Sequence, residues 1–468
     1  MIPLRAAIPH TLGMAQDSRR IEPRTLKGFR DYLPQAAIAR EWLTERACSV
    51  YRSYGFSPID TPALEYEEIL AGKGGQETEK QMFRFEDPGG RRVALRFDLT
   101  VPLARFVAQY ANELGLPFKR YHIATVWRGE KPQKGRFREF VQCDFDTIGT
   151  ESACADIESG LVIVDLMLAL GFERFTVHVN DRRVLAGLLE LLGLEQRTAP
   201  ILRALDKLDK AGPRAVAAEM VSAGGASEAQ AAQVLALAAV EGTNEEVVRA
   251  LEGLVGANET GGAGAAALGA FDAAVTAAGA PAGAFRLRPS LARGLDYYTG
   301  VVFETILDEL PSIGSVCGGG RYDDLAQLFT GQRLPGVGAS LGVDRLLAAM
   351  EELGQMGATR STAPVFMPFF AAERLCDYLR LAALLRRGGI AVELYPEPRK
   401  LGAQLRYADR RGFALALILG DEEWAAGECQ IKDLATGEST VTPLESPAGG
   451  LVVAVERALR AREGRNRK

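Results

Sequence analysis

The sequence predicts a mixed α/β protein built on an antiparallel sheet, and three observations carry this prediction. Within the first 150 residues, strand-like segments come in pairs joined by short loops, which suits antiparallel neighbours and does not suit a parallel sheet. Residues 196–281 are rich in alanine and glycine, with Glu, Gln and Leu at helical spacing, which predicts an inserted helical module. After residue 364, strands alternate with helices over about 100 residues, which predicts a compact α/β unit.

The N-terminal part is expected to begin with one long helix. Apolar side chains recur at helical spacing over residues 35–54, and Gly55 ends the run. A strand candidate that ends at Thr61-Pro62 follows the helix. Two hairpin-like pairs come next, so the first 150 residues are expected to form a sheet of antiparallel pairs. The paired segments are 82–85 with 93–97, and 121–128 with 137–147.

Strand-like sequence resumes after the insert, at Phe285 and over 301–306. In the C-terminal unit, the pattern predicts strands at 365–370, 390–395 and 414–419, and helices at 371–387, 400–411 and 449–462. Residues 1–24 hold three prolines and no apolar core of signal-peptide length, so they are expected to be a loose extension.

Composition excludes several classes of protein. The chain has 468 residues and a formal net charge of −5, with no apolar run of about 20 residues, so no transmembrane helix is expected. Its six cysteines include no CxxC pair, which argues against a zinc finger or a disulfide framework and favours a reducing cytoplasm. The chain has three histidines, which argues against a histidine-based metal site or catalytic triad.

The densest cluster of charge lies at residues 128–140, in a loop between two expected strands. Arg136 and Arg138 lie two residues apart, and strand periodicity would place them on one face. Guanidinium groups that lie close together repel one another unless a polyanion lies between them. A phosphate chain suits them, because each group can form bidentate hydrogen bonds with it. The alternative is a solvated hairpin tip.

Three further segments attract attention, although each has a structural explanation as well. Residues 293–300 combine an arginine with two adjacent tyrosines, expected as one core ring and one edge ring. Residues 318–323 hold three glycines, which allow close approach of a backbone to a ligand or strand. Residues 336–346 read as a glycine-spaced strand that enters a helix. They lack the Gly-Lys-Ser/Thr ending of a Walker A loop, and the chain has no dinucleotide fingerprint after a first strand.

Together, these segments resemble the histidyl-tRNA synthetase family of class II aminoacyl-tRNA synthetases, from about Lys27 to about Leu459. Residues 27–31 resemble the N-terminal opening of the family. Residues 57–62, 128–146 and 336–346 resemble motifs 1, 2 and 3 of the class. The histidine branch is marked by 293–298 and 319–323, while 400–405 and 431–433 resemble its anticodon-binding domain.

The resemblance implies an antiparallel catalytic sheet flanked by helices, at residues 25–195 and 282–355, interrupted by the helical module at 196–281. Residues 364–468 would form the anticodon-binding domain. The implied reaction joins L-histidine to ATP, releases pyrophosphate, and passes the histidyl group to the 3′-terminal ribose of its tRNA. A homodimer is also implied, because motif 1 builds the dimer interface of the class. Mg²⁺ is expected to accompany ATP as a counterion, without a metal cage made by the protein alone.

The resemblance also implies roles for residues near ATP. Arg128 matches the motif 2 arginine that grips the α-phosphate, and Arg293 matches an arginine on its other side, where related enzymes place a metal ion. Arg136 and Arg345 match positions that hold the outer phosphates and the adenine region. Lys131 and Gln133 are expected to touch the tRNA acceptor stem, with simple solvent exposure as the alternative.

Six more residues match positions around the amino acid. Asp98, Thr100 and Gln142 match those that hold the α-amino group of histidine. Asp98 and Thr100 are expected on one strand, two residues apart and therefore on the same face. The positions around the imidazole are matched by Asp146, Tyr298 and Tyr322.

Three alternatives remain open at this point. A paralogue of the family is a regulatory subunit of the ATP phosphoribosyltransferase of histidine biosynthesis, which generally lacks the C-terminal domain and active-site arginines. Another class II synthetase, for threonine, proline or glycine, is disfavoured by residues 293–298. An RNA-binding sensor without catalysis is disfavoured by the complete set of arginines: Arg128, Arg293 and Arg345.

Overall fold

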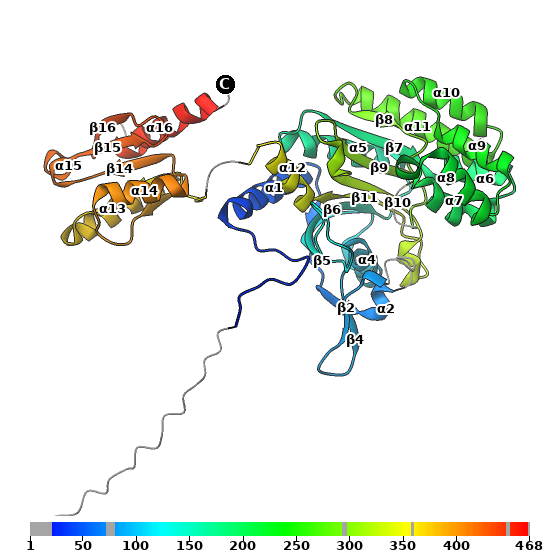
Figure 1. Cartoon of the computed structure of the whole chain (residues 1–468), viewed down its shortest axis with the longest axis horizontal. Coiled ribbons are helices and arrows are strands. Elements are labelled where there is room, and N and C mark those ends of the chain that lie inside the picture. Colours follow the sequence, from blue (N-terminus) through cyan, green and yellow to red (C-terminus); the bar gives the residue numbers. More distant parts are fainter. Residues whose placement is uncertain (1–20, 72–79, 293–296, 357–359, 446–449, 467–468) are drawn as a thin grey trace, which may run out of the picture.

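The computed structural model describes residues 21–71, 80–292, 297–356, 360–445 and 450–466 (Figure 1). Of the expected N-terminal extension, residues 1–20 lie outside the described residues. The main body is a large sheet with helices against it, and a smaller α/β unit follows at the C-terminus. In the part of the chain that the structure describes, no helix has both the length and the apolar character needed to cross a membrane.

Eight strands form the large sheet, and their order confirms the mixed α/β prediction. Neighbouring strands are antiparallel in the centre, whereas the two edge pairs, β1 with β5 and β7 with β8, are parallel. In spatial order, the strands are β1 (Ser57–Pro58), β5 (Phe118–Trp127), β6 (Glu139–Ile148), β11 (Gly336–Gly342), β10 (Cys317–Tyr322), β9 (Val301–Leu307), β7 (Phe175–Asp181) and β8 (Phe285–Leu287).

Helices cover the apolar face of this sheet. The expected first helix is α1 (Pro34–Ser53), which packs against α5 (Ala153–Ala169) and α12 (Val343–Glu352). Leu43, Ala47 and Tyr51 of α1 follow helical spacing and are fully buried. The Tyr51 ring lies 5.4 Å from that of Phe145, so α1 and β6 share one core.

A second, smaller sheet lies apart from the large one, and here the sequence prediction was wrong. The hairpin of β3 (Arg84–Glu86) and β4 (Arg92–Leu95) forms as expected, but it pairs with β2 (Leu64–Tyr66) and joins no strand of the large sheet. Helices α2 (Glu67–Leu70) and α4 (Thr100–Leu114) pack beside it. This unit shares a core with Tyr297 and Tyr322, so it lies over the opposite face of the large sheet from α1.

The insert is helical, as expected, and some of its glycines allow its helices to pack closely. Strand β7 is followed by α6 (Arg182–Leu191), η1 (Glu195–Arg197), α7 (Thr198–Leu205), α8 (Leu208–Ser222), α9 (Glu228–Ala238), α10 (Asn244–Val255) and α11 (Glu259–Ala277). A Cβ on Gly187 of α6 would lie 2.4 Å from the backbone of Gly261 in α11. Glycine therefore permits close contact of these two helices, and the insert shares the core of the large sheet.

The C-terminal unit is a five-stranded sheet between helices, with two more strands than the sequence predicts. The two unforeseen strands, β15 and β16, extend the sheet in antiparallel fashion beside β14. The elements are β12 (Val365–Met367), α13 (Leu375–Arg387), β13 (Val392–Leu394), α14 (Leu401–Arg411), β14 (Leu415–Ile418), α15 (Asp421–Ala426), β15 (Glu428–Asp433), β16 (Ser439–Pro443) and α16 (Gly450–Asn466). Separate apolar clusters fill its two faces.

Candidate active site

Strand β6 carries the polar wall of the candidate site. Its residues alternate, so Gln142, Asp144 and Asp146 share one face, while Cys143 and Phe145 point into the core beneath α1. All five are buried. The polar face of β6 therefore lies where the two tyrosine-bearing segments and the smaller sheet meet the large sheet.

Asp146 has two partners in the sheet, one on the adjacent strand β5 and one on β10, beyond β11. Arg120 of β5, directly opposite in the register, places Nη2 2.5 Å from Asp146 Oδ2, and its side chain is fully buried. Tyr322 of β10 donates its hydroxyl hydrogen to Asp146 Oδ1. Only glycine fits at Gly338 of β11, because a Cβ there would lie 2.3 Å from Asp146 Oδ1. The structure thus brings together two of the residues expected around the imidazole.

Tyr298, the third of these residues, lies beside them. Its ring is 5.1 Å from the ring of Tyr297, edge to face, and a Cβ on Gly320 would approach it to 3.0 Å. Tyr297 is buried and Tyr298 is half-buried, as expected for one core ring and one edge ring. The Tyr297 ring also lies 5.8 Å from Tyr322, so the three tyrosines form one aromatic cluster.

Asp98 and Thr100 reach the site from a different local structure than the sequence predicts. Asp98 lies in the short loop between β4 and α4, and Thr100 is the first residue of α4, so they do not share the face of a strand. Asp98 Oδ1 accepts a hydrogen bond of 3.1 Å from the backbone N–H of Val101, within the first turn of the helix. Asp98 is buried, and its negative charge contributes to raising the pKa of Tyr297 and of Asp146. The prediction that Asp98 and Thr100 share a strand was therefore wrong, although Asp98 lies in the same cluster as Asp146.

The buried carboxylates are held in an unfavourable electrostatic environment. Burial raises the pKa of Asp98 to about 6 and that of Asp146 to about 7, even though Arg128 and Arg120, respectively, favour the ionised forms. Burial also raises the pKa of Asp144. Three carboxylates gathered around two arginines favour the arrival of a cation.

Several buried acceptor atoms at this place lack a donor. Within the described ranges, Asp98 Oδ2, Gln142 Oε1 and Asp144 Oδ1 accept no hydrogen bond from the protein. Gln142 is held by its amide nitrogen, which donates to Ser340 Oγ at 2.7 Å, so its oxygen is left free. Buried acceptors are normally paired, and those that are not suggest a missing partner. A ligand that brings an ammonium group and ring N–H donors would satisfy them.

A cleft of about 270 Å³ opens next to this cluster. Its wall holds three of the arginines that match ATP-binding positions: Arg128, Arg136 and Arg345. Gln142 and Ser340 line it as well, so it adjoins the carboxylate cluster. Arg128 lies at the junction, because its charge acts on Asp98 and on Arg345 alike.

The arginines of the cleft are positioned by neutral groups. Arg128 Nε donates to the carbonyl oxygen of Phe97 at 2.9 Å, and its guanidinium lies 5.2 Å from the centre of the Phe140 ring. Arg345 donates to the carbonyl oxygen of Ser315. Burial and the charge of Arg136 lower the pKa of Arg345 to about 10. A cation whose charged form is disfavoured by a neighbouring cation favours a polyanion between the two.

Arg138 does not join this set, contrary to the expectation that it shares a face with Arg136. Residues 133–136 form a tight turn, with Gly135 at φ 68°, so strand alternation does not apply to them. Arg138 turns away and donates to the carbonyl oxygens of Glu130 and Lys27. It thereby links the segment around Lys27 to the loop between β5 and β6.

Two further predicted residues have no described contact that defines a role, and a third is not described. Lys131 and Gln133 are exposed in the loop between β5 and β6. Arg293 lies outside the described residues.

Sequence reasoning missed two residues of this site, Arg120 and Asp144. Asp144 lies between Gln142 and Asp146 on the same face of β6, so the period of two would have identified it. Arg120 depends on the cross-strand register of β5 with β6, which no local pattern reveals.

Comparison with known proteins adds independent information. The model of the family "Histidyl-tRNA synthetase" matches residues 28–346, and that of the "Anticodon binding domain" matches residues 368–451. A histidine–tRNA ligase of Rhodopirellula baltica is 58% identical over 419 residues, covering 90% of this chain and 95% of the relative. The second match concerns the very domain that the regulatory-subunit alternative is expected to lack, so it disfavours that alternative.

Solved structures agree with this result. The crystal structure of histidyl-tRNA synthetase from Nostoc sp. PCC 7120 aligns with a TM-score of 0.84 at 32% identity, covering 94% of this chain and all of that one. An ATP phosphoribosyltransferase regulatory subunit/histidyl-tRNA synthetase from Bacillus halodurans aligns with a TM-score of 0.69 at 24% identity, covering 82% of this chain and 97% of that one, which shows the shared fold alone. From the matched family model, the close relatives and the antiparallel sheet that carries the site, we conclude that this chain belongs to the histidyl-tRNA synthetase family.

Proposed function

We propose that the carboxylate cluster and the arginine cleft are the two halves of one active site, for histidine and for ATP. The chain is a histidine–tRNA ligase, an ATP-dependent aminoacyl-tRNA synthetase. The observation that carries the assignment of residues is the set of buried acceptors without donors at Asp98, Gln142 and Asp144, beside a cleft lined by arginines. One half suits a cationic amino acid and the other a triphosphate.

On the histidine side, Asp98, Thr100 and Gln142 would hold the α-amino group. An ammonium has three donors and no acceptor, which matches the free oxygens of Asp98 and Gln142. Asp146, Tyr298 and Tyr322 would surround the imidazole. A hydrogen-bonding site of this kind rejects apolar amino acids strongly, because they would leave its buried polar groups unpaired.

On the ATP side, Arg128 would contact the α-phosphate, while Arg136 and Arg345 would hold the outer phosphates and the adenine region. Arg293 is assigned to the opposite side of the α-phosphate by resemblance alone. Mg²⁺ would neutralise the outer phosphates when ATP is bound. Among the described residues, no group of three His, Cys, Asp or Glu side chains is close enough to hold a metal, so the ion would be carried by the nucleotide.

The reaction then needs little covalent chemistry from the protein. The histidine carboxylate attacks the α-phosphorus, and the bond to the bridging oxygen of pyrophosphate breaks. Fixed cations aimed at the α-phosphate stabilise the charge that develops there. In the second step, the terminal ribose hydroxyl of tRNA attacks the carbonyl carbon of the adenylate, and AMP leaves.

Other assignments follow from the family and remain proposals. The C-terminal unit would bind the anticodon, and Lys131 and Gln133 would meet the acceptor stem. The chain would act as a cytoplasmic homodimer. Its functional divisions would be a catalytic domain at 25–195 and 282–355, a helical insert at 196–281 and an anticodon-binding domain at 364–468.

The experiment that tests this proposal is ATP–pyrophosphate exchange with each of the twenty amino acids, in the absence of tRNA. We expect exchange with histidine alone. Exchange with a different amino acid would overturn the assignment of the carboxylate cluster to the imidazole and the ammonium group. Histidine binding without any exchange would overturn the assignment of the arginines.

Replacing Tyr298 with phenylalanine tests the histidine side separately. Only the hydroxyl is lost, and the ring keeps its packing against Tyr297 and Gly320. We expect KM for histidine to rise about tenfold, the effect of one hydrogen bond, with KM for ATP unchanged. Steady-state exchange kinetics with each substrate varied in turn will measure both. Equal increases for the two substrates would remove Tyr298 from the histidine pocket.

A further inference from the structure

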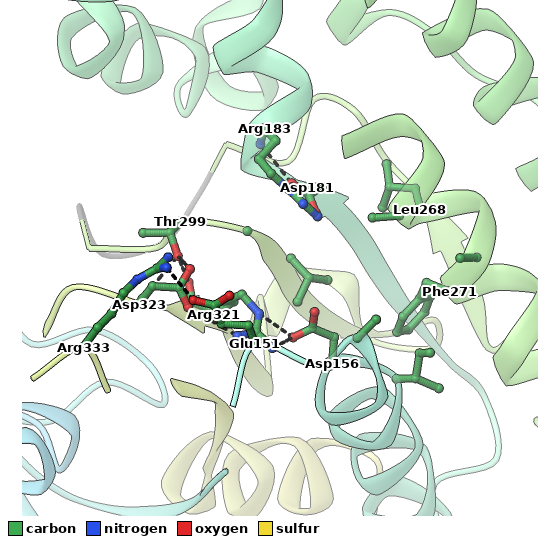
Figure 2. A pocket seen from close by; sticks show the side chains of 16 residues that line it. Glu151, Asp156, Asp181, Arg183, Leu268, Phe271, Thr299, Arg321, Asp323 and Arg333 are labelled. Atoms are coloured by element: carbon green, nitrogen blue, oxygen red, sulfur yellow. Dashed lines mark hydrogen bonds and ion pairs between the residues drawn. The ribbon is translucent and has the colours of Figure 1, made fainter. Parts of the chain in front are cut away.

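A second cavity, of about 380 Å³, lies outside the ATP cleft, where the end of β10, the start of α5 and helix α11 meet (Figure 2). Its wall is densely charged, and each arginine there has a carboxylate partner. The pairs are Arg183 with Asp181, Arg321 with Asp156 and Asp323, and Arg333 with Glu151. Charges with partners in the protein require no charged ligand, so the role of this network must lie in what it holds in place.

Arg321 is the centre of the network. Its side chain is 8% exposed, and its guanidinium lies between Asp156 and Asp323, as Figure 2 shows. Nη2 is 2.7 Å from Asp156 Oδ1, and Nη1 is 3.3 Å from Asp323 Oδ1. Nη1 also donates to the carbonyl oxygen of Thr150 at 3.0 Å. One side chain thus ties β10 to the loop before α5 and to the first turn of that helix.

The backbone of Arg321 is linked to both tyrosines assigned to the imidazole. Tyr322 follows it in β10, on the opposite face of the strand, and donates to Asp146. The carbonyl oxygen of Arg321 accepts from the N–H of Thr299 at 2.8 Å, and Thr299 directly follows Tyr298. The hydroxyl of Thr299 donates to Asp323 Oδ2 at 2.8 Å, which closes the link.

We propose that Arg321 is a positioning residue for histidine recognition, which fixes Tyr298 and Tyr322 together from outside the pocket. This inference rests on the proposed role of the two tyrosines. Arg321 acts on Thr299 and on the end of strand β10, whereas the arginine cleft touches that strand only at its start, at Cys317 and Gly318. Loss of its contacts would therefore shift the tyrosine hydroxyls and leave the triphosphate cleft as it is. Recognition is sensitive to such shifts, because a site loosened by about 1 Å loses much of its function.

The test is an Arg321→Ala variant assayed by pyrophosphate exchange, with and without ethylguanidinium. This ion replaces the atoms that the substitution removes, and the adjoining cavity gives it a way in. We expect KM for histidine to rise roughly tenfold with KM for ATP unchanged, as for one misplaced hydrogen bond. Millimolar ethylguanidinium should then lower KM for histidine again, and sodium chloride at equal ionic strength should not.

The matched control is Arg333→Ala, which removes an arginine from the wall of the same cavity. Arg333 is 59% exposed and pairs with Glu151, which does not belong to β10. We expect normal kinetics and no response to ethylguanidinium. Asp156→Asn is the second test, should Arg321→Ala fail to fold, because it removes only the charge of the main partner. It should raise KM for histidine selectively. An unchanged KM, or equal rises for histidine and ATP, would overturn the proposal.

Tyr322→Phe separates this proposal from the function on which it rests. If Tyr322→Phe leaves KM for histidine unchanged, the tyrosine does not read the imidazole, and the proposed function of that residue fails. If Tyr322→Phe raises KM for histidine and both Arg321→Ala and Asp156→Asn leave it unchanged, only the positioning role is overturned. Increases in all three variants, with rescue of Arg321→Ala, support both.

Discussion

Replacing Arg128 with methionine is expected to lower kcat of histidine-dependent pyrophosphate exchange by roughly 10²–10³-fold, the usual effect of removing one preorganised donor from developing charge. The guanidinium is fixed before ATP arrives, because Nε donates to the Phe97 carbonyl oxygen at 2.9 Å and the group lies over the Phe140 ring. Methionine keeps a stem of similar length. The expected loss therefore reflects the missing charge and its hydrogen bonds.

Two measurements make this prediction specific. Arg136→Met should raise KM for ATP more than it lowers kcat, since Arg136 is an exposed residue of the cleft wall, assigned to the outer phosphates. Arg174→Met, in an exposed ion pair with Glu309, serves as a control for the loss of an arginine elsewhere. Assays at pH 8 keep Asp98 ionised after the loss of Arg128, whose charge helps to keep its pKa down. A decrease in kcat of less than tenfold would exclude Arg128 from the α-phosphate.

The parts of the fold that local patterns determine were predictable from the sequence. Helix α1 was predictable from the 3.6-residue spacing of its apolar side chains. The C-terminal unit was predictable from the alternation of strand-like and helical segments after residue 364. Strands β15 and β16 escaped detection because polar residues dominate them. Even Val441, an aliphatic residue of β16, is 60% exposed at the sheet edge. The smaller sheet escaped because strand pairing depends on long-range register.

The errors within the site have equally specific causes. Residues 93–97 were assigned to a strand, and this assignment hid the start of α4 at Thr100, although proline is tolerated in the first turn of a helix, where Pro102 lies. Arg138 was grouped with Arg136 by a strand rule, but Gly135 at positive φ makes a turn there. Arg120 meets Asp146 only through the pairing of β5 with β6. Residue type therefore indicated the chemistry, while neighbours distant in sequence decided the geometry.

The second large effect concerns Asp98, whose replacement by asparagine should stabilise the protein and weaken histidine binding at the same time. In the unfolded chain, its pKa is expected near 3.9, whereas burial raises the pKa in the folded protein to about 6. The folded state then prefers the proton. Stability linked to this group is fully present below about pH 4 and is lost as the pH rises through about 6. A pKa difference of about two between the folded and the unfolded state corresponds to about 3 kcal/mol in the free energy of unfolding.

Asparagine carries no charge at any of these pH values and keeps the oxygen that accepts from the Val101 N–H. At pH 8, without ligand, Asp98→Asn should therefore raise the free energy of unfolding by up to about 3 kcal/mol, and near pH 4 the two proteins should be equal. Denaturant titrations across this range will measure the difference. The matched control is Asp181→Asn, because Asp181 is buried yet paired with Arg183, so this variant should lose stability. A lower stability of Asp98→Asn at pH 8 would contradict the prediction.

The same substitution should remove the partner of the histidine ammonium group. Loss of one member of a buried charge pair typically costs 2–5 kcal/mol of binding, so KM for histidine should rise by at least about 30-fold. Saturating histidine stabilises a protein that binds it, and this gain should be seen with the wild-type chain and be largely absent from Asp98→Asn. The carboxylate would then be retained although it lowers the stability of the fold, because only the charged form holds the substrate. Such a trade of stability for binding is expected of a functional residue. If Asp98→Asn binds histidine normally, the free oxygen of Asp98 serves another purpose, and the ammonium must be held elsewhere in the cluster.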